Sequence, residues 1–188
     1  NSQGAYVAAK YAIDHPEKVG KIVYIGSNTV YQAMHDKPLR KMRSFLDVIG
    51  YDYTEESLRS FMTRNIANGT EVPEELIQLR HTAATRPGVK EANDAFDAYI
   101  ARMNDEPKLW TRYSLKDALP KLDIPSIFIW GKQDHVAPVE VGEKLAAMLP
   151  NVPFHYLDDC GHQCQTDQPE IVNNLVIDFL QVKTAVPN

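Results

Sequence analysis

Three side chains of this sequence have types and surroundings that could support nucleophilic chemistry, and the first is a serine. Ser2 stands in Asn-Ser-Gln-Gly, which matches the last part of a Gly-x-Ser-x-Gly pattern. That pattern forms a tight strand-to-helix turn that exposes the serine hydroxyl. On its own this fragment is equally typical of a helix N-cap followed by a turn. The serine therefore needs a base and an orienting anion before it is a credible nucleophile.

An aspartate and a histidine could supply these two parts. Asp134 lies in Gly-Lys-Gln-Asp, just after a strand-like run, and His162 lies in Asp-Cys-Gly-His after the next such run. Each has an ordinary explanation, because an aspartate past a strand commonly caps a turn and a loop histidine is commonly solvated. A serine hydroxyl reacts when a base takes its proton and an anion orients that base. The order Ser2, Asp134, His162, at predicted strand ends, favours the combined interpretation.

The elements that must position these residues follow from apolar periodicity. Helical spacing covers residues 3–14, 138–149 and 169–180, and short β-branched or aromatic runs cover 19–25, 125–131 and 152–157. Runs this short and apolar are typical of buried strands. Strand and helix alternate at the spacing of βαβ units, so we predict an α/β fold with parallel strands and flanking helices.

The middle of the chain has a different pattern, with helical spacing and no strand-like run from about 38 to 115. One helix is predicted from 39 to 49, one begins after Thr54, one begins at Pro73, and one follows Gly88. The last of these should turn one stripe inward, namely Ala92, Ala95, Phe96, Tyr99 and Ile100. We therefore predict a helical lid, residues 37–116, inserted between core segments 1–36 and 117–188.

Composition excludes several classes of protein. The chain has 188 residues, a formal charge of −5 and 44 % hydrophobic residues, which suits one domain with an inserted subdomain. Lysine and arginine form no block, so nucleic acid and anionic membrane are not expected partners. No apolar run approaches the ~20 residues that span a bilayer. We expect a cytoplasmic protein that acts on a small molecule.

Two cysteines flank the candidate histidine. Cys160 and Cys164 could join His162 in a metal site that recruits nearby acids, namely Asp158, Asp159 and Asp167. A disulfide across four residues would be strained unless the backbone turned sharply. We expect two reduced thiols, no metal and no cofactor.

The chain resembles the α/β-hydrolase superfamily over essentially its whole length. The matching pieces are Asn-Ser-Gln-Gly at the start, residues 14–19, 125–134 and 159–162, and the closing helix. Within the superfamily it is most similar to the meta-cleavage-product hydrolases, on residues 54–59, 73–80 and 160–162. Those enzymes cut a carbon–carbon bond in vinylogous 1,5-diketones from aromatic-ring breakdown.

The resemblance implies roles for five residues. Ser2 would be the nucleophile, or a general base toward water, with His162 as the proton shuttle and Asp134 as its orienting anion. The backbone N–H of Gln3 would serve an oxyanion hole, and Arg80 would contact the substrate unless it is simply an exposed helix arginine. The chain departs from the family at Gln163 and His81, where aromatic residues are usual. Both changes make the predicted pocket more polar.

The resemblance also leaves alternatives open. A carboxylesterase or lactonase is the second candidate, and a non-catalytic receptor on the same fold is a third from another class. The chain is expected to be the C-terminal portion of the fold, beginning at the nucleophile turn. Its first strand would then have an unpaired edge, and the 188 residues alone would be inactive without an N-terminal segment of the same protein. Homo-oligomerisation stays open.

Overall fold

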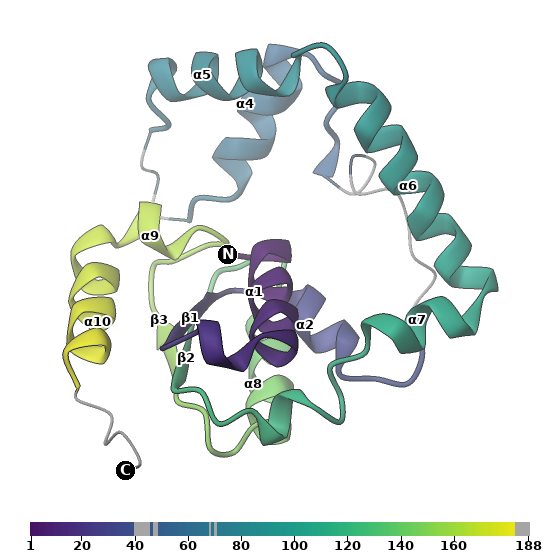
Figure 1. The fold of residues 1–188 in the computed structure, drawn as a ribbon. Helices are drawn as coiled ribbons and strands as arrows, with labels where there is room; N and C mark the ends of the chain where they lie inside the picture. Colours follow the sequence, from purple (N-terminus) through teal and green to yellow (C-terminus); the bar gives the residue numbers. More distant parts are fainter. Residues whose placement is uncertain (40–45, 47–48, 68, 70, 183–188) are drawn as a thin grey trace.

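The computed structural model describes residues 1–182 except for 40–45, 47–48, 68 and 70. The helix predicted over 39–49 lies largely outside the described residues. Three strands form one sheet: β1 (Ile22–Ile25), β2 (Ser126–Gly131) and β3 (Phe154–Leu157). All pair in parallel, as predicted, and their order across the sheet is β1-β2-β3 (Figure 1).

Helices connect and cover these strands. The core helices are α1 (Gln3–Asp14), α2 (Asn28–Ala33), α8 (Val139–Met148), α9 (Cys164–Asp167) and α10 (Pro169–Gln181), with short 3₁₀ turns at Pro16–Lys18 and Leu119–Lys121. The three long core helices match the predicted ranges within two residues. The short helices α2 and α9 were not predicted, because one or two turns carry too little periodicity to be detected.

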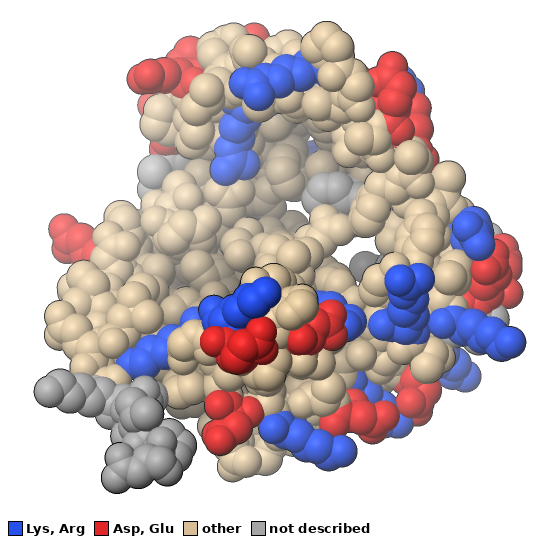
Figure 2. All heavy atoms as spheres, in the orientation of Figure 1, with Lys and Arg blue, Asp and Glu red and all other residues tan. Residues whose placement is uncertain are grey.

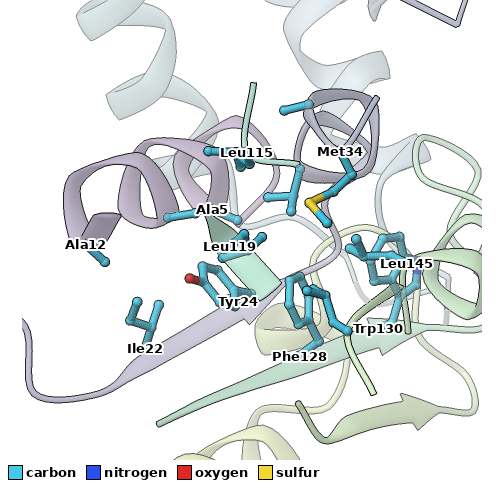
Figure 3. Packing of buried hydrophobic residues seen from close by; sticks show 14 of the residues in the cluster. Ala5, Ala12, Ile22, Tyr24, Met34, Leu115, Leu119, Phe128, Trp130 and Leu145 are labelled. Carbon is cyan, nitrogen blue, oxygen red and sulfur yellow. The ribbon is translucent and has the colours of Figure 1, made fainter. Parts of the chain in front are cut away.

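The sheet separates two apolar clusters, because successive side chains of a strand point to opposite faces. On one face Phe128 and Trp130 pack with residues of α1, α2 and α8 (Figure 3). On the other face Ile127 and Ile129 pack with Val172 of α10 and with both cysteines. The central strand β2 is buried on both faces, which explains its continuous apolar sequence.

Helix α1 lies close to the sheet because its inward stripe is made of alanine. Ala5, Ala9 and Ala12 are buried against the first cluster, as their spacing predicted. Small side chains let the helix backbone approach the sheet, and this fixes where the start of α1 lies. The site serine is immediately before that start.

The helical block consists of α4 (Glu55–Arg64), α5 (Glu74–Ala84), α6 (Val89–Asp105) and α7 (Pro107–Tyr113), which form an arch in Figure 1. Among its described residues no strand occurs. The predicted N-cap of α4 is confirmed, because the Thr54 hydroxyl accepts the Ser57 N–H at 3.2 Å.

The inward stripe predicted for α6 was wrong at three of its five positions, whereas Tyr99 and Ile100 are half-buried. Ala92, Ala95 and Phe96 are exposed, and Met103 is the buried residue of this helix. Within the described chain α6 packs mainly on its neighbour α7. Much of its predicted apolar face therefore has no core surface to pack against. Periodicity indicated a helix but could not supply a partner surface.

The two ends of the helical block are joined at a neck. The Leu115 N–H donates to the Ala33 carbonyl at 2.8 Å, and the Trp110 indole N–H donates to the His35 carbonyl at 2.8 Å. Lys116 forms an ion pair with Asp36 at the same place. The chain therefore leaves and re-enters the core at one point.

The surface and the sheet edge bear on possible partners. Figure 2 shows positive and negative side chains interspersed on the face drawn, without a continuous patch of one sign. None of the helices that the structure describes is long and apolar enough to cross a membrane. Among the described residues, β1 pairs with β2 along one edge and with no strand along the other.

Candidate active site

Ser2 occupies a strained turn directly before α1. Its φ of 52° and ψ of −122° lie in a region that residues with a side chain rarely adopt. Two hydrogen bonds hold this conformation: the Ser2 N–H donates to the Ile25 carbonyl at 2.9 Å, and the Ser27 hydroxyl donates to the Ser2 carbonyl at 2.7 Å. The end of β1 thus fixes the serine backbone, and strain at such a position is typical of functional sites.

Asp134 and His162 form a buried pair at the carboxyl end of the sheet. The His162 Nδ1 lies 2.7 Å from Asp134 Oδ2, and the two residues are 5 % and 4 % exposed. The other carboxylate oxygen, Oδ1, accepts the backbone N–H groups of Val136 and Ala137 at 2.8 and 2.7 Å. Because the carboxylate only accepts, the imidazole hydrogen belongs on Nδ1, and Nε2 keeps a free lone pair.

Asn1 connects the serine turn to the histidine loop. Its side-chain amide donates to the His162 carbonyl at 2.9 Å and to the Ile25 carbonyl at 3.2 Å. Within the part of the chain that the structure describes, the Ser2 hydroxyl itself makes no hydrogen bond to the imidazole. Such bonds are often long in ligand-free sites and tighten when substrate binds.

Two glycines give the pair its space. A Cβ on Gly26, whose φ is +34°, would lie 3.0 Å from Asp134 Oδ2 and 3.6 Å from His162 Nδ1. A Cβ on Gly131, at the end of β2, would lie 2.3 Å from the carbonyl oxygens of Cys160 and Gly161. The strand ends therefore have to be free of side chains for the histidine loop to cross them.

The other two candidate residues are placed differently. Gln3 is the first residue of α1, and its backbone N–H donates to no acceptor among the described residues. It is thus available at a helix N-terminus, where negative charge is favoured. Arg80 lies exposed on α5 and has no ion pair among the residues described. The structure does not bring Arg80 into contact with His162 or Asp134.

The cysteines beside His162 are buried free thiols. Burial, reinforced by Asp167, raises the pKa of the Cys160 thiol to about 11, and burial also raises the pKa of Cys164. Thiols with raised pKa values stay protonated near neutral pH and are poor nucleophiles and metal ligands. Within the described ranges no group of three or more His, Cys, Asp or Glu side chains could hold a metal ion.

Sequence reasoning missed the residues that position the site without taking part in its chemistry. Asn1, Gly26 and Ser27 carry no reactive group in the expected spacing, yet they hold the serine turn and the Asp134–His162 pair. Gly-Ser-Asn after a strand was visible as a stop, and Ser27 could have been recognised as an N-cap. The hydrogen bond from the Ser27 hydroxyl to the Ser2 carbonyl joins two distant segments, and no sequence pattern predicts it.

Comparison with known families identifies the class. A model of the alpha/beta hydrolase fold matches residues 1–169. The chain belongs to the α/β-hydrolase family, and both the predicted fold class and the predicted family are confirmed.

Individual relatives give further detail. Over 180 aligned residues the chain is 28 % identical to a 2-hydroxy-6-oxononadienedioate/2-hydroxy-6-oxononatrienedioate hydrolase of Paraburkholderia phymatum. The alignment covers 96 % of this chain and 60 % of that protein. A meta-cleavage product hydrolase from Pseudomonas fluorescens has the same fold, with a TM-score of 0.70 and 23 % identity over 96 % of this chain and 62 % of that one. A membrane phospholipase A gives a TM-score of 0.64 and 27 % identity, covering 96 % and 55 %. The chain thus spans about 60 % of the length of the curated relative.

Proposed function

We propose that this protein is a serine hydrolase of small organic molecules in which Ser2, His162 and Asp134 act as a triad. The observation that carries the proposal is the buried 2.7 Å contact between His162 and Asp134, joined through Asn1 to the strained turn of Ser2. A strained serine, an oriented imidazole and a buried carboxylate at one sheet edge are the parts that nucleophilic catalysis needs.

In the proposed mechanism one proton is transferred between Ser2, His162 and the leaving group. With its hydrogen on Nδ1, His162 has Nε2 free to take the proton of the Ser2 hydroxyl, or of a water that the serine orients. Asp134 stabilises the imidazolium that forms, and the N–H groups of Val136 and Ala137 keep its carboxylate in place. The imidazolium then returns the proton to the leaving group.

The backbone N–H of Gln3 is proposed as one donor to the oxyanion that forms when the carbonyl is attacked. It is unpaired within the described chain and lies at the N-terminus of α1, next to the serine. Fixed backbone donors of this kind commonly contribute a factor of about 10² to 10³ in rate.

For the substrate we propose a vinylogous diketone from aromatic degradation, cut at a carbon–carbon bond. This rests on the similarity to the Paraburkholderia phymatum enzyme, whose name describes such dioate substrates. Arg80 is the proposed contact for a carboxylate of the substrate, because it is an exposed cation on α5 without an ion pair among the described residues. Reaching the reaction centre would require the helical block to close.

An ester or lactone substrate is the second candidate. Gln163 and His81 stand where the meta-cleavage family usually has aromatic residues, and the similarity to a phospholipase A also favours ester chemistry.

We further propose that residues 37–116 act as a lid over core segments 1–36 and 117–188. The neck supports these boundaries, since Ala33 and His35 on one side bond to Leu115 and Trp110 on the other. The block also contacts the histidine loop, where the Gln163 N–H donates to the Asn65 carbonyl, so closing of the lid would be felt at the site.

The test uses the full-length protein with two substrate types, a meta-cleavage dienoate and a p-nitrophenyl ester. We expect turnover of the dienoate to exceed that of the ester, and we expect Ser2→Ala to abolish both. Ser60→Ala, an exposed serine on α4, is the matched control and should keep full activity.

Three outcomes separate the candidates. Ester turnover without dienoate turnover would replace the first substrate class with the second. Unchanged activity in Ser2→Ala would reject the triad. Absence of any fluorophosphonate labelling at Ser2 in the active-site assay would favour a non-catalytic receptor.

A further inference from the structure

A second buried carboxylate lies beside the histidine loop and takes no part in the triad. Asp167 ends α9, and its side chain is 4 % exposed. A carboxylate is rarely buried unless hydrogen-bond donors compensate for the lost hydration. The groups that donate hydrogen bonds to Asp167 therefore indicate which segments it holds in place.

Among the described residues, donors to Asp167 come from two separate parts of the molecule. Asp167 Oδ2 accepts the Gly161 N–H at 2.6 Å, and Gly161 directly precedes His162. The same carboxylate accepts the Ala67 N–H at 3.1 Å through Oδ1 and at 3.3 Å through Oδ2. Ala67 lies in the helical block, 100 positions away in the chain from Asp167.

The segment around Ala67 rests on the histidine loop. The Gln163 N–H donates to the Asn65 carbonyl at 3.3 Å, and a Cβ on Gly161 would lie 2.6 Å from that carbonyl oxygen. We call residues 65–67 the lid foot. It follows α4 and lies beside α9 in Figure 1. The lid foot thus lies directly against the backbone of Gly161, the neighbour of His162, with no room for a side chain at position 161.

We infer that Asp167 is a positioning residue that couples the lid foot to His162. Its carboxylate accepts hydrogen bonds from Gly161 and Ala67 at the same time. It thereby fixes the distance between the His162 imidazole and the sheet, and it makes that distance depend on the position of the helical block. This inference rests on the proposed hydrolase function for its catalytic consequence, whereas the coupling itself is a property of the fold.

The charge is what makes the coupling tight. An ionised carboxylate offers acceptor sites on both oxygens, and bonds from N–H groups to it are shorter and stronger than neutral ones. An asparagine would keep one acceptor oxygen but would present an N–H₂ group to one of the two backbone donors. One of the two bonds would then be lost, and the loop and the lid foot would separate.

The experiment compares Asp167→Asn and Asp167→Glu in the full-length protein, with Asp158→Asn as the matched control. Asp158 is an exposed acid that pairs with Lys132 near the same loop. Active serines are counted by stoichiometric fluorophosphonate labelling, so that turnover is expressed per active site. We expect Asp167→Asn to lower kcat per active site about ten- to a hundredfold with little change in KM for a small ester. Asp167→Glu should recover part of this loss, and Asp158→Asn should have no effect.

Hydrogen exchange gives a readout that does not depend on catalysis. In the wild-type protein the amides of Gly161 and Ala67 should exchange slowly although both lie outside helices. In Asp167→Asn at least one of the two should exchange faster, because one hydrogen bond is lost, while the amides of β2 keep their protection.

The outcomes distinguish this inference from the proposed function. If the wild type neither labels nor turns over any substrate, the proposed function fails, and the exchange experiment still decides the coupling. If the wild type is active but Asp167→Asn keeps normal kcat per active site, or if neither amide exchanges faster in that variant, the inference is overturned. Fast exchange of either amide in the wild type would overturn it even if the variant does not fold.

Discussion

At the scale of the residue, the geometry of the site depends on positions that have no reactive group. Gly26 lies next to the Asp134–His162 pair and has a φ of +34°. A Cβ at this position would lie 3.0 Å from the Asp134 carboxylate. Ser27 holds the carbonyl of Ser2 from the same turn. The reactive side chains are thus oriented by the backbone at the end of β1.

Gly26→Ala should therefore lower both stability and activity. The positive φ and the close contact with Asp134 together should cost about 1–3 kcal/mol of unfolding free energy. Urea denaturation measures this cost, and turnover per labelled serine measures the displacement of His162. Gly20→Ala is the control, because a Cβ there meets nothing within 4 Å, and it should change stability by no more than about 0.5 kcal/mol.

Asp134→Asn should disable the proposed triad without unfolding the protein. The amide is nearly the same size as the carboxylate, but it no longer fixes the hydrogen of His162 on Nδ1 or stabilises the imidazolium. We expect kcat to fall by about 10³ to 10⁴, measured on the substrate that the wild type prefers. A loss smaller than tenfold, with correct folding by circular dichroism, would contradict the role of Asp134.

At the scale of the element, the helical block is held by few contacts compared with the core helices. Among the described residues α4 and α5 bury Leu58, Met62 and Ile77 in a small cluster of their own. Ala92, Ala95 and Phe96 of α6 stay exposed, and the block joins the core at the neck and at residues 65–67. Such a block should open at a lower free energy than the sheet.

Thr54→Ala tests this local stability. The Thr54 hydroxyl caps α4 by accepting the Ser57 N–H, and removing an N-cap typically costs about 1 kcal/mol. We expect faster hydrogen exchange in α4 and α5 with no change in β2. The control is Thr63→Ala, an exposed position inside α4, which removes the same hydroxyl without removing a cap. Equal effects of the two variants would show that the cap does not matter.

At the scale of the whole molecule, both faces of β2 bury ionisable side chains in neutral form. On one face burial raises the pKa of the Cys160 thiol to about 11. On the other face burial raises the pKa of the Tyr24 hydroxyl above its ordinary value. Folding favours the protonated thiol, so its contribution to stability is complete below the ordinary thiol pKa near 9. That contribution is lost as pH rises from about 9 toward 11.

The free energy of unfolding should therefore fall above pH 9. Each such thiol contributes a slope of at most about 1.4 kcal/mol per pH unit. Denaturant titrations at pH 8, 9 and 10 measure the slope, and the Cys160→Ala/Cys164→Ala double variant should show a smaller one. Identical slopes in the two proteins would mean that the buried thiols do not control the alkaline stability.

The sequence by itself determined the fold class, the three strands, the long core helices and the residues with reactive groups. Those features depend on local periodicity and on residue type, which are visible in one dimension. The order Ser2, Asp134, His162 at predicted strand ends led to the hypothesis that the three act together, and the structure pairs two of them, His162 and Asp134.

Only the tertiary structure decided which groups hold that arrangement and which surfaces are covered. The bonds from Asn1 to His162, from Ser27 to Ser2 and from Ala67 to Asp167 join segments far apart in the chain, and their partners leave no periodic signal. The exposed stripe of α6 was mispredicted for the same reason. Hydrophobic spacing reports that a helix has a face to bury, whereas the packing of distant segments decides whether that face is buried.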